Sequence, residues 1–351
     1  MKVAFITQGK NVSSARFRTQ QYFPLLTARG IRCAHFPRIP KARSSKKTGA
    51  IGRALGTAVA IPTRTAAIVQ APMFDVVVLQ RELLRFLSPW PEQLLAKVSA
   101  KLIFDFDDAI WLRYRGADRQ NPIAHIISSS DSVCAGNKYL AEYAEQYNPN
   151  VFIVPTPIDT QHITPRTADT VDDKFRIGWT GASSTLKYLS ELKPVFRKLR
   201  RLGDNIILSI ICDQKPTEDL GLPIEYVPWN PTNEVDALRR FDVGVMPIPN
   251  DEWSRGKCSF KLLQYMAAAV PSICSPVGMN IDVIGTKGSR GILAESPADW
   301  ETGLAEYYGN VHFRRRVGDN GRAHVDKFYS INVQAESLEN ILTQTVHERS
   351  L

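Results

Sequence analysis

The sequence predicts an α/β protein built from two doubly wound parallel-sheet domains that face a central cleft. Its 351 residues, 44% of them hydrophobic, suffice for two separate cores. Short runs of Val, Ile and Phe alternate with helical stretches, which is typical of buried parallel strands. This alternation stops at a linker rich in Pro, Thr and Asp, residues 155–173, and then begins again. We therefore expect ligands at the carboxyl ends of the strands, in the crevice between the domains.

Residues 1–160 are expected to form the first domain. A helix over 13–28 follows the first strand, because Ser13 or Ser14 can cap its start and Gly30 can end it. The apolar runs predict strands over residues 3–7, 31–36, 74–80, 101–106, 132–136 and 151–155.

Residues 161–330 are expected to form the second domain. Its first strand ends in a glycine turn, and Ser183, Ser184 or Thr185 can cap a helix that runs through Leu202. Residues 331–351 are predicted to form a C-terminal helix, mainly over 331–347, that packs back on the first domain. The strands expected in the second domain cover residues 175–181, 206–212, 224–229, 242–248 and 271–275.

Composition favours a cytoplasmic location. No apolar run reaches the ~18–20 residues that cross a bilayer, and the N-terminal MKVAFITQG has the pattern of a strand rather than of a signal peptide. The number of cysteines is odd and their spacing fits no metal site, so we expect free thiols in a reducing compartment. The cysteines are Cys33, Cys134, Cys212, Cys258 and Cys274.

Positive charge is concentrated in the first 74 residues. They contain thirteen Lys and Arg and no Asp or Glu, whereas the whole chain has a net charge of +9. This asymmetry favours an anionic partner such as a membrane surface, a lipid phosphate or a polyanionic glycan. Nucleic acid is disfavoured, because no nucleic-acid-binding module is recognisable. Residues 38–53, with six basic residues, are predicted to contact an anionic membrane surface peripherally.

The stretch from Ser254 to Asn280 carries the strongest functional signal. A polar loop leads into a helix, with Lys257 and Lys261 one helical turn apart. Free backbone N–H groups and the helix dipole at such a start attract anions. We therefore predict a diphosphate site formed by the two lysines and the backbone of Lys257, Cys258, Ser259 and Phe260. The alternative is that the lysines lie on the solvated face of a surface helix.

A second phosphate site is predicted after residues 175–181. Gly181, Ser184 and Lys187 lie at a strand-to-helix junction. Because this junction and the loop before Lys261 follow strands of one sheet, we expect them to face the same diphosphate. A capped helix with an exposed lysine is the alternative.

Three carboxylates follow the fourth strand of the first domain, at Asp105, Asp107 and Asp108. Carboxylates at a strand end are costly unless they are solvated, paired or bound to a substrate. We predict that they bond sugar hydroxyls or orient an acceptor hydroxyl. A divalent metal site is the alternative, and we consider a metal unlikely.

Further contacts are predicted on both domains. Gly9, in the turn after the first strand, is predicted to contact the nucleotide sugar. Arg16 and Arg18, near the start of the first helix, suit a phosphate or carboxylate of an acceptor. Trp229 could stack on a nucleobase. Ordinary surface charge for the arginines and a half-buried core position for the tryptophan are the alternatives.

Several segments resemble GT-B-fold glycosyltransferases, and specifically family 4 of the retaining glycosyltransferases. The resemblance covers most of the chain and implies two Rossmann-like domains. The strongest match is KCSFKLLQYMAAAVPSICSPVGMN, supported by DFDDAIW, VPTPID, DALRRFDVGVMPI and SARFRTQQYFPLL.

This resemblance assigns roles to individual positions. The family's diphosphate-binding lysine falls on Lys187, whereas its neighbouring arginine is replaced by Ala182. Its pair of glutamates falls on Gly256 and Gln264, and the amide of Gln264 could still bond ribose hydroxyls. Asp107 takes the place of a sugar-contacting histidine. These departures suggest a variant branch.

Together with the site residues, the resemblance implies a metal-independent, retaining glycosyltransferase. It would move a sugar from a UDP- or GDP-linked donor, held by the second domain, to a hydroxyl of a glycan, a lipid-linked or another anionic acceptor held by the first. The predicted catalytic residues are Asp107, Asp108, Lys187 and Lys261. The alternatives are a non-catalytic nucleotide-binding or scaffold module of the same fold and a nucleotide-sugar epimerase.

Overall fold

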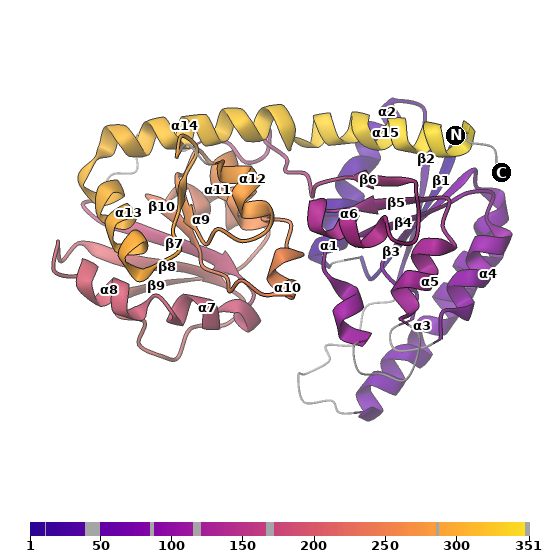
Figure 1. Cartoon of the computed structure of the whole chain (residues 1–351), viewed down its shortest axis with the longest axis horizontal. Helices are drawn as coiled ribbons and strands as arrows, with labels where there is room; N and C mark the ends of the chain where they lie inside the picture. Colours follow the sequence, from indigo (N-terminus) through magenta and orange to yellow (C-terminus); the bar gives the residue numbers. More distant parts are fainter. Residues whose placement is uncertain are drawn as a thin grey trace. The chain divides into compact units, whose positions relative to one another are not determined.

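The polypeptide divides into two compact units (Figure 1). Unit 1 comprises Met1–Pro157 and Ile331–Leu351, and unit 2 comprises Ile158–Ser330. The computed structural model describes residues 1–10, 12–38, 50–84, 88–114, 121–165, 172–285 and 288–347, with side chains within 50–70 described from Ala60 onward.

Unit 1 is built on a six-stranded parallel sheet in the order β2-β1-β3-β4-β5-β6. β1 lies between β2 and β3, so that Val3 is aligned with both Cys33 and Val76. All six strands expected in this part of the sequence are confirmed. They are β1 (Lys2–Thr7), β2 (Arg32–Pro37), β3 (Val76–Gln80), β4 (Leu102–Phe106), β5 (Ser132–Ala135) and β6 (Val151–Ile153).

The single helix expected over residues 13–28 is wrong. The chain forms α1 (Ser13–Arg18), a short 3-10 turn η1 (Gln20–Tyr22) and α2 (Phe23–Ala28). Pro24 explains the break, because it has no N–H to donate to the carbonyl of Gln20. The other helical segments of unit 1 are α3 (Ala50–Gln70), η2 (Ala71–Met73), α4 (Trp90–Val98), η3 (Ile110–Tyr114), α5 (Pro122–Ser128), α6 (Lys138–Ala144) and α15 (Ile331–His347).

The C-terminal helix α15 belongs to the core of unit 1. Ala335, Leu338 and Leu342 pack with strand residues such as Val3 in one buried cluster. The hydroxyls of Ser132 and Thr345 are hydrogen-bonded at 2.9 Å and are likewise buried. The last helix thus completes the first unit (Figure 1).

Unit 2 has a second six-stranded parallel sheet, in the order β12-β11-β10-β7-β8-β9. The five strands expected here are confirmed, whereas the two-residue β12 was too short to predict. The strands are β7 (Phe175–Gly181), β8 (Ile206–Cys212), β9 (Ile224–Pro228), β10 (Val243–Met246), β11 (Ser272–Cys274) and β12 (Ile292–Leu293).

Helices flank both faces of this second sheet (Figure 1). A continuous apolar cluster that includes Trp179, Phe196 and Tyr307 fills the interior. The helical segments of unit 2 are η4 (Ser183–Thr185), α7 (Lys187–Ser190), α8 (Lys193–Leu199), α9 (Glu234–Arg239), α10 (Glu252–Arg255), α11 (Phe260–Ala267), α12 (Met279–Ile284), α13 (Pro297–Gly309) and α14 (Val311–Phe328).

The strand order of unit 2 reverses between β7 and β10, and these two strands separate toward their carboxyl ends. Their register contains only two residue pairs, at Val243 and Gly244 of β10. Beyond them the phenol of Tyr265 lies between the strands: it accepts the N–H of Thr180 at 3.1 Å and lies 3.3 Å from the carbonyl of Val245. Tyr265 therefore bridges the strands where their ladder has ended and fixes α11 to this point.

Two glycines make room for this arrangement. A Cβ on Gly244 would lie 2.3 Å from the ring of Tyr265, and one on Gly178 would lie 2.0 Å from the ring of Phe241. Both aromatic rings are buried against the backbone of the sheet. The close approach of ring and strand thus requires glycine at both positions.

The described residues also bear on the expectations about membrane-spanning helices and cysteines. None of the helices in the described ranges has the length and apolarity needed to cross a bilayer. All five cysteines are free thiols, as expected, with Cys33 half-buried and the others buried.

Tyr265→Phe tests the bridge between β7 and β10. Loss of the hydroxyl leaves a buried N–H and a buried carbonyl without their partner, so we expect the free energy of unfolding to fall by about 1–3 kcal/mol. Tyr188→Phe, on the partly buried helix α7, is the matched control and should change it by less than about 0.5 kcal/mol. Urea denaturation followed by circular dichroism measures both. Equal losses in the two variants would contradict the proposed bridge.

Candidate functional site

The start of α11 is held in place by a buried hydrogen-bond chain. Ser259, the residue before the helix, has a left-handed backbone with φ 49°, which is uncommon for a residue other than glycine. Its hydroxyl bonds the Asn280 side chain at 2.7 Å, and the Asn280 amide donates to the carbonyl of Ser275 at 3.0 Å. The helix start is thereby tied to the loop that follows β11.

Lys261 places its ammonium at the carboxyl end of β7. The Nζ atom lies 4.3 Å from the ring centroid of Trp179. A Cβ on Gly181 would lie only 2.8 Å from the same Nζ. Within the described parts of the chain, no carboxylate forms an ion pair with this ammonium. It lies against the tryptophan ring instead. The glycine predicted as part of a phosphate turn thus provides the space that the lysine side chain occupies.

The surroundings of Lys261 disfavour its charged form. Burial, and secondarily the nearby charge of Lys257, lower its pKa from 10.5 to about 7. Lys257 itself lies over the ring of Trp253, at 4.8 Å from the centroid. Lys257 thus adds a second positive charge one helical turn from Lys261, and a bound anion would stabilise this site.

The backbone groups expected to hold phosphate are partly engaged within the protein. The N–H of Lys257 donates to the carbonyl of Ser254 at 3.0 Å. At the other junction, the N–H of Ser183 donates to the Asp213 carboxylate at 2.6 Å and its hydroxyl does so at 3.2 Å. Asp213, the first residue after β8, was missed by the sequence analysis; its position at a strand end was the available signal.

Lys187 and Ser184 are both exposed. Lys187 begins α7, and its ammonium lies 5.0 Å from the ring centroid of the adjacent Tyr188. This environment differs from that of Lys261, and the expected convergence of the two lysines on one diphosphate stays a prediction.

Gln264 pairs with a carboxylate from another helix. It is buried, and its amide donates to Glu234 of α9 at 2.9 Å. Glu234 therefore places a carboxylate beside the amide of Gln264. No pattern in the sequence identified Glu234, because its partner lies thirty residues away. Trp229 directly follows β9 and is 38% exposed.

In unit 1, Arg18 and Asp105 form a buried ion pair. The guanidinium also donates to the carbonyl of Val154 at 2.9 Å and to the hydroxyl of Thr156 at 3.2 Å. These bonds fix α1 to the ends of β4 and β6. Arg16 of the same helix is partly buried, with its guanidinium 4.9 Å from the ring centroid of Phe17.

Asp107 and Asp108 are held together by Arg81, which follows β3. Its NH2 group lies 2.6 Å from an oxygen of each carboxylate. Arg81 has φ 59°, an uncommon conformation for a residue with a side chain. The sequence analysis missed Arg81. Gly9, at the end of the neighbouring β1, is buried.

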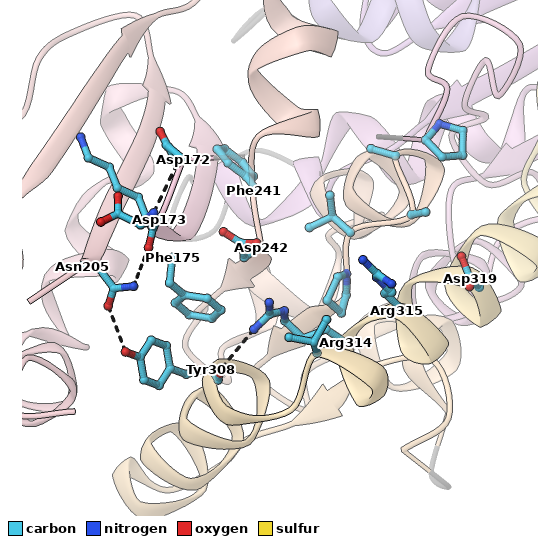
Figure 2. Close-up of a pocket in the computed structure, with 17 residues that line it drawn as sticks. Asp172, Asp173, Phe175, Asn205, Phe241, Asp242, Tyr308, Arg314, Arg315 and Asp319 are labelled. Carbon is cyan, nitrogen blue, oxygen red and sulfur yellow. Dashed lines mark hydrogen bonds between the residues drawn. The ribbon is translucent and has the colours of Figure 1, made fainter. Parts of the chain in front are cut away.

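A cavity of about 630 Å³ lies at the opposite edge of the unit 2 sheet, where the strands begin (Figure 2). There the Asn205 amide donates to the carbonyl of Asp173 at 2.5 Å and accepts the Tyr308 hydroxyl at 2.9 Å (Figure 2). None of the predicted site residues lines this cavity. It is therefore separate from the edge that carries Lys261.

Comparison with protein-family models and with curated proteins finds no match. Among solved structures, sucrose-phosphate synthase from Thermosynechococcus elongatus matches with a TM-score of 0.74 and 13% identity over 98% of both chains. Anabaena HepE in complex with UDP matches with a TM-score of 0.68 and 13% identity over 98% of this chain and 100% of that one. A glycosyltransferase from Rickettsia africae matches with a TM-score of 0.69 and 11% identity over 99% of both chains.

This protein has the GT-B fold. Its structural neighbours are glycosyltransferases. In this GT-B protein, the carboxyl edge at the β7/β10 reversal is the place where doubly wound sheets bind ligands. Lys261 and Gly181 lie at that edge.

Among the residues that the structure describes, the carboxylates of the GT-B protein form no recognisable metal centre. Within the described ranges, no group of three or more His, Cys, Asp or Glu side chains is arranged to hold a metal ion. Asp105 is paired with Arg18, and Asp107 and Asp108 are paired with Arg81. The metal-independence expected from the sequence stays a prediction.

The lowered pKa of Lys261 predicts a pH dependence of stability. Between pH 7 and about 10.5 the unfolded chain holds a proton that the folded protein has lost, so stability rises with pH across this window and is level below it. The slope is at most about 1.4 kcal/mol per pH unit. Lys261→Met should remove this component. Urea denaturation of both proteins across the window measures the difference, and parallel profiles would contradict the assignment.

Proposed function

We propose that this protein is a glycosyltransferase that binds the diphosphate of a UDP- or GDP-sugar at the carboxyl edge of unit 2. The observation that carries this proposal is Lys261, a partly buried cation between Trp179 and Gly181 at the point where the strand order reverses. An anionic ligand supplies the countercharge that the described residues do not. The likeness to HepE, which was solved with UDP and with UDP-glucose, supports this choice of ligand.

The surrounding residues suit the parts of such a donor. Lys257 and the start of α11 add positive potential beside Lys261, and Lys187 would add a further cation. Gln264, together with Glu234, would bond the ribose hydroxyls. Trp229, exposed at the end of β9, would stack on the base.

Transfer would proceed with retention of the anomeric configuration. The acceptor hydroxyl attacks the anomeric carbon on the face from which the diphosphate leaves, and its proton passes to the leaving phosphate oxygen. The C–O bond to the donor breaks as the new one forms, and Lys187 and Lys261 stabilise the charge that develops on the nucleoside diphosphate. No divalent metal is required in this scheme.

Unit 1 would hold the acceptor, a glycan, a lipid-linked or another anionic molecule. Arg81 holds Asp107 and Asp108 at the end of β4, where their oxygens would orient a sugar hydroxyl. Arg16 would contact an anionic group. The roles predicted for Arg18 and Asp105 would be indirect, because their pairing shapes this edge.

The proposed site of action is the cytoplasmic face of a membrane. The sequence prediction assigned the contact to residues 38–53, whose side chains beyond Arg38 lie outside the described residues. The positive charge of residues 1–74 supports an anionic surface as partner.

Titration calorimetry with UDP and GDP tests the diphosphate site. Lys261→Met should weaken binding of the preferred nucleotide at least about tenfold, since a charge-assisted contact is lost. Gly181→Ala should also weaken binding, because its Cβ would lie only 2.8 Å from the Lys261 Nζ and would displace the ammonium. Lys198→Met, which removes an exposed lysine of α8 paired with Glu301, is the control and should bind normally.

Assays of donor consumption separate the alternatives. Transfer from a UDP- or GDP-sugar to an acceptor, unchanged by a metal chelator, supports the proposed enzyme. Binding without consumption would establish the non-catalytic module, and conversion of the donor without an acceptor would establish an epimerase. Unaltered affinity in Lys261→Met would overturn the assignment of the diphosphate site.

Nucleotide affinity should decrease as the pH rises above 7. A bound diphosphate raises the pKa of Lys261 from about 7, so the complex takes up a proton that the free protein lacks at higher pH. The dissociation constant should increase by at most about tenfold per pH unit. Calorimetry in buffers of different ionisation enthalpy should show this proton uptake. A profile in Lys261→Met as steep as in the parent would exclude Lys261 as its source.

A further inference from the structure

Over residues 60–73, where side chains are described, the outward face of α3 and η2 carries no charge. The large apolar side chains are prominent, with Ile61 50%, Val69 70% and Met73 66% exposed. Within residues 60–73 the only charged side chain is Arg64, and it is 2% exposed. The exposed positions of this stretch are Ile61, Pro62, Thr65, Ala66, Val69, Gln70, Pro72 and Met73.

Arg64 points into unit 1 and anchors the helix there. Its guanidinium donates to the carbonyls of Thr7 at 2.8 Å and of Leu83 at 3.2 Å. The helix thus has its charged residue inside and its apolar residues outside, the reverse of an ordinary amphipathic surface helix. Sequestration of an arginine by backbone carbonyls lets the outward face remain uncharged.

Helix α4 also exposes large apolar side chains and buries one charged residue. Trp90 and Leu94, one turn apart, are 61% and 40% exposed, whereas Glu92 is 3% exposed. The Glu92 carboxylate accepts the N–H of Leu83 at 2.7 Å. Since Arg64 binds the carbonyl of the same Leu83, one residue anchors both helices.

Helices α3 and α4 are neighbours in unit 1. α4 contacts both α3 and η2, and the two helices lie along one side of unit 1 (Figure 1). We call the combined surface of Ile61, Val69, Met73, Trp90 and Leu94 the α3–α4 face. An exposed apolar face of this kind indicates an interaction site rather than a solvated surface.

Charge identifies the partner. The first 74 residues contain thirteen basic side chains and no acidic one, and Lys97 is exposed one turn beyond Leu94. A symmetric contact between two copies would bring two such positive segments together, which is unfavourable. An anionic lipid surface instead offers phosphates for the cations and an interfacial layer that suits tryptophan and aliphatic side chains.

We propose that the α3–α4 face docks this protein on an anionic lipid bilayer. Its apolar side chains enter the headgroup layer while Lys97 contacts the lipid phosphates. This inference does not depend on glycosyl transfer, because it rests on residues of unit 1 that are not among the proposed site residues. It names a different surface from residues 38–53.

Co-sedimentation with vesicles tests the proposal. The parent protein should bind vesicles that contain phosphatidylglycerol and bind poorly to vesicles of phosphatidylcholine alone. The triple variant Val69→Ser, Met73→Ser, Trp90→Ser should lose at least about tenfold in partitioning, because three apolar side chains no longer enter the interface. A control triple variant, Leu202→Ser, Val311→Ser, Phe328→Ser, replaces apolar residues of unit 2 that are 51%, 43% and 47% exposed and should bind as the parent does.

Three outcomes would overturn the proposal. They are equal partitioning of the parent and the α3–α4 variant, no preference of the parent for anionic vesicles, and a parent dimer that the variant converts to monomers without any vesicle binding. Nucleotide affinity, measured by calorimetry on the same folded variants, should be unchanged. Failure of the vesicle experiment would therefore not contradict the diphosphate site. Failure of the nucleotide-binding experiment would likewise not contradict membrane docking.

Discussion

The site in unit 2 depends on how the sheet is held open between β7 and β10. Parallel strands that leave a reversal point in opposite directions along the sheet carry their helices on opposite faces, so their carboxyl ends separate. The short register at Val243 and Gly244 leaves backbone groups of Thr180 and Val245 without a partner across the β7/β10 ladder, and burial of unpaired backbone groups is costly. The hydroxyl of Tyr265 accepts the N–H of Thr180 and donates to the carbonyl of Val245. The opening is thereby stabilised from inside α11.

The same constraint positions Lys261, one helical turn before Tyr265. Because Tyr265 fixes the rotation of α11, Lys261 is directed to the end of β7, over Trp179 and into the space left by Gly181. Burial of the Lys261 ammonium removes it from water, which lowers the stability of the folded protein. The buried aromatic packing around Tyr265 and Phe241 can offset this loss. A rigid core thus supports a cation that would be better stabilised with a ligand bound.

The features that the sequence predicted correctly are those encoded by neighbouring residues. Continuous apolar runs identified every strand except the two-residue β12, and the helix start at Phe260 followed from the polar loop before it. Partners from distant segments were not predicted. Glu234 contacts Gln264 only because α9 packs near α11, and Arg81 contacts Asp107 only because β3 and β4 are neighbours in the sheet. The break before Pro24 was readable in principle, since proline cannot donate the bond that a continuous helix needs.

A comparison of buried cations separates structural residues from candidate functional ones. Arg18 has a carboxylate and Arg64 has backbone carbonyls, so each buried guanidinium is satisfied by the protein itself. In both cases the charge holds an N-terminal helix to the ends of the strands. Lys261, by contrast, has an aromatic ring and a second lysine as its neighbours. A cation whose partners are complete contributes to folding, whereas Lys261, which forms no carboxylate ion pair among the described residues, is a candidate for binding an anion.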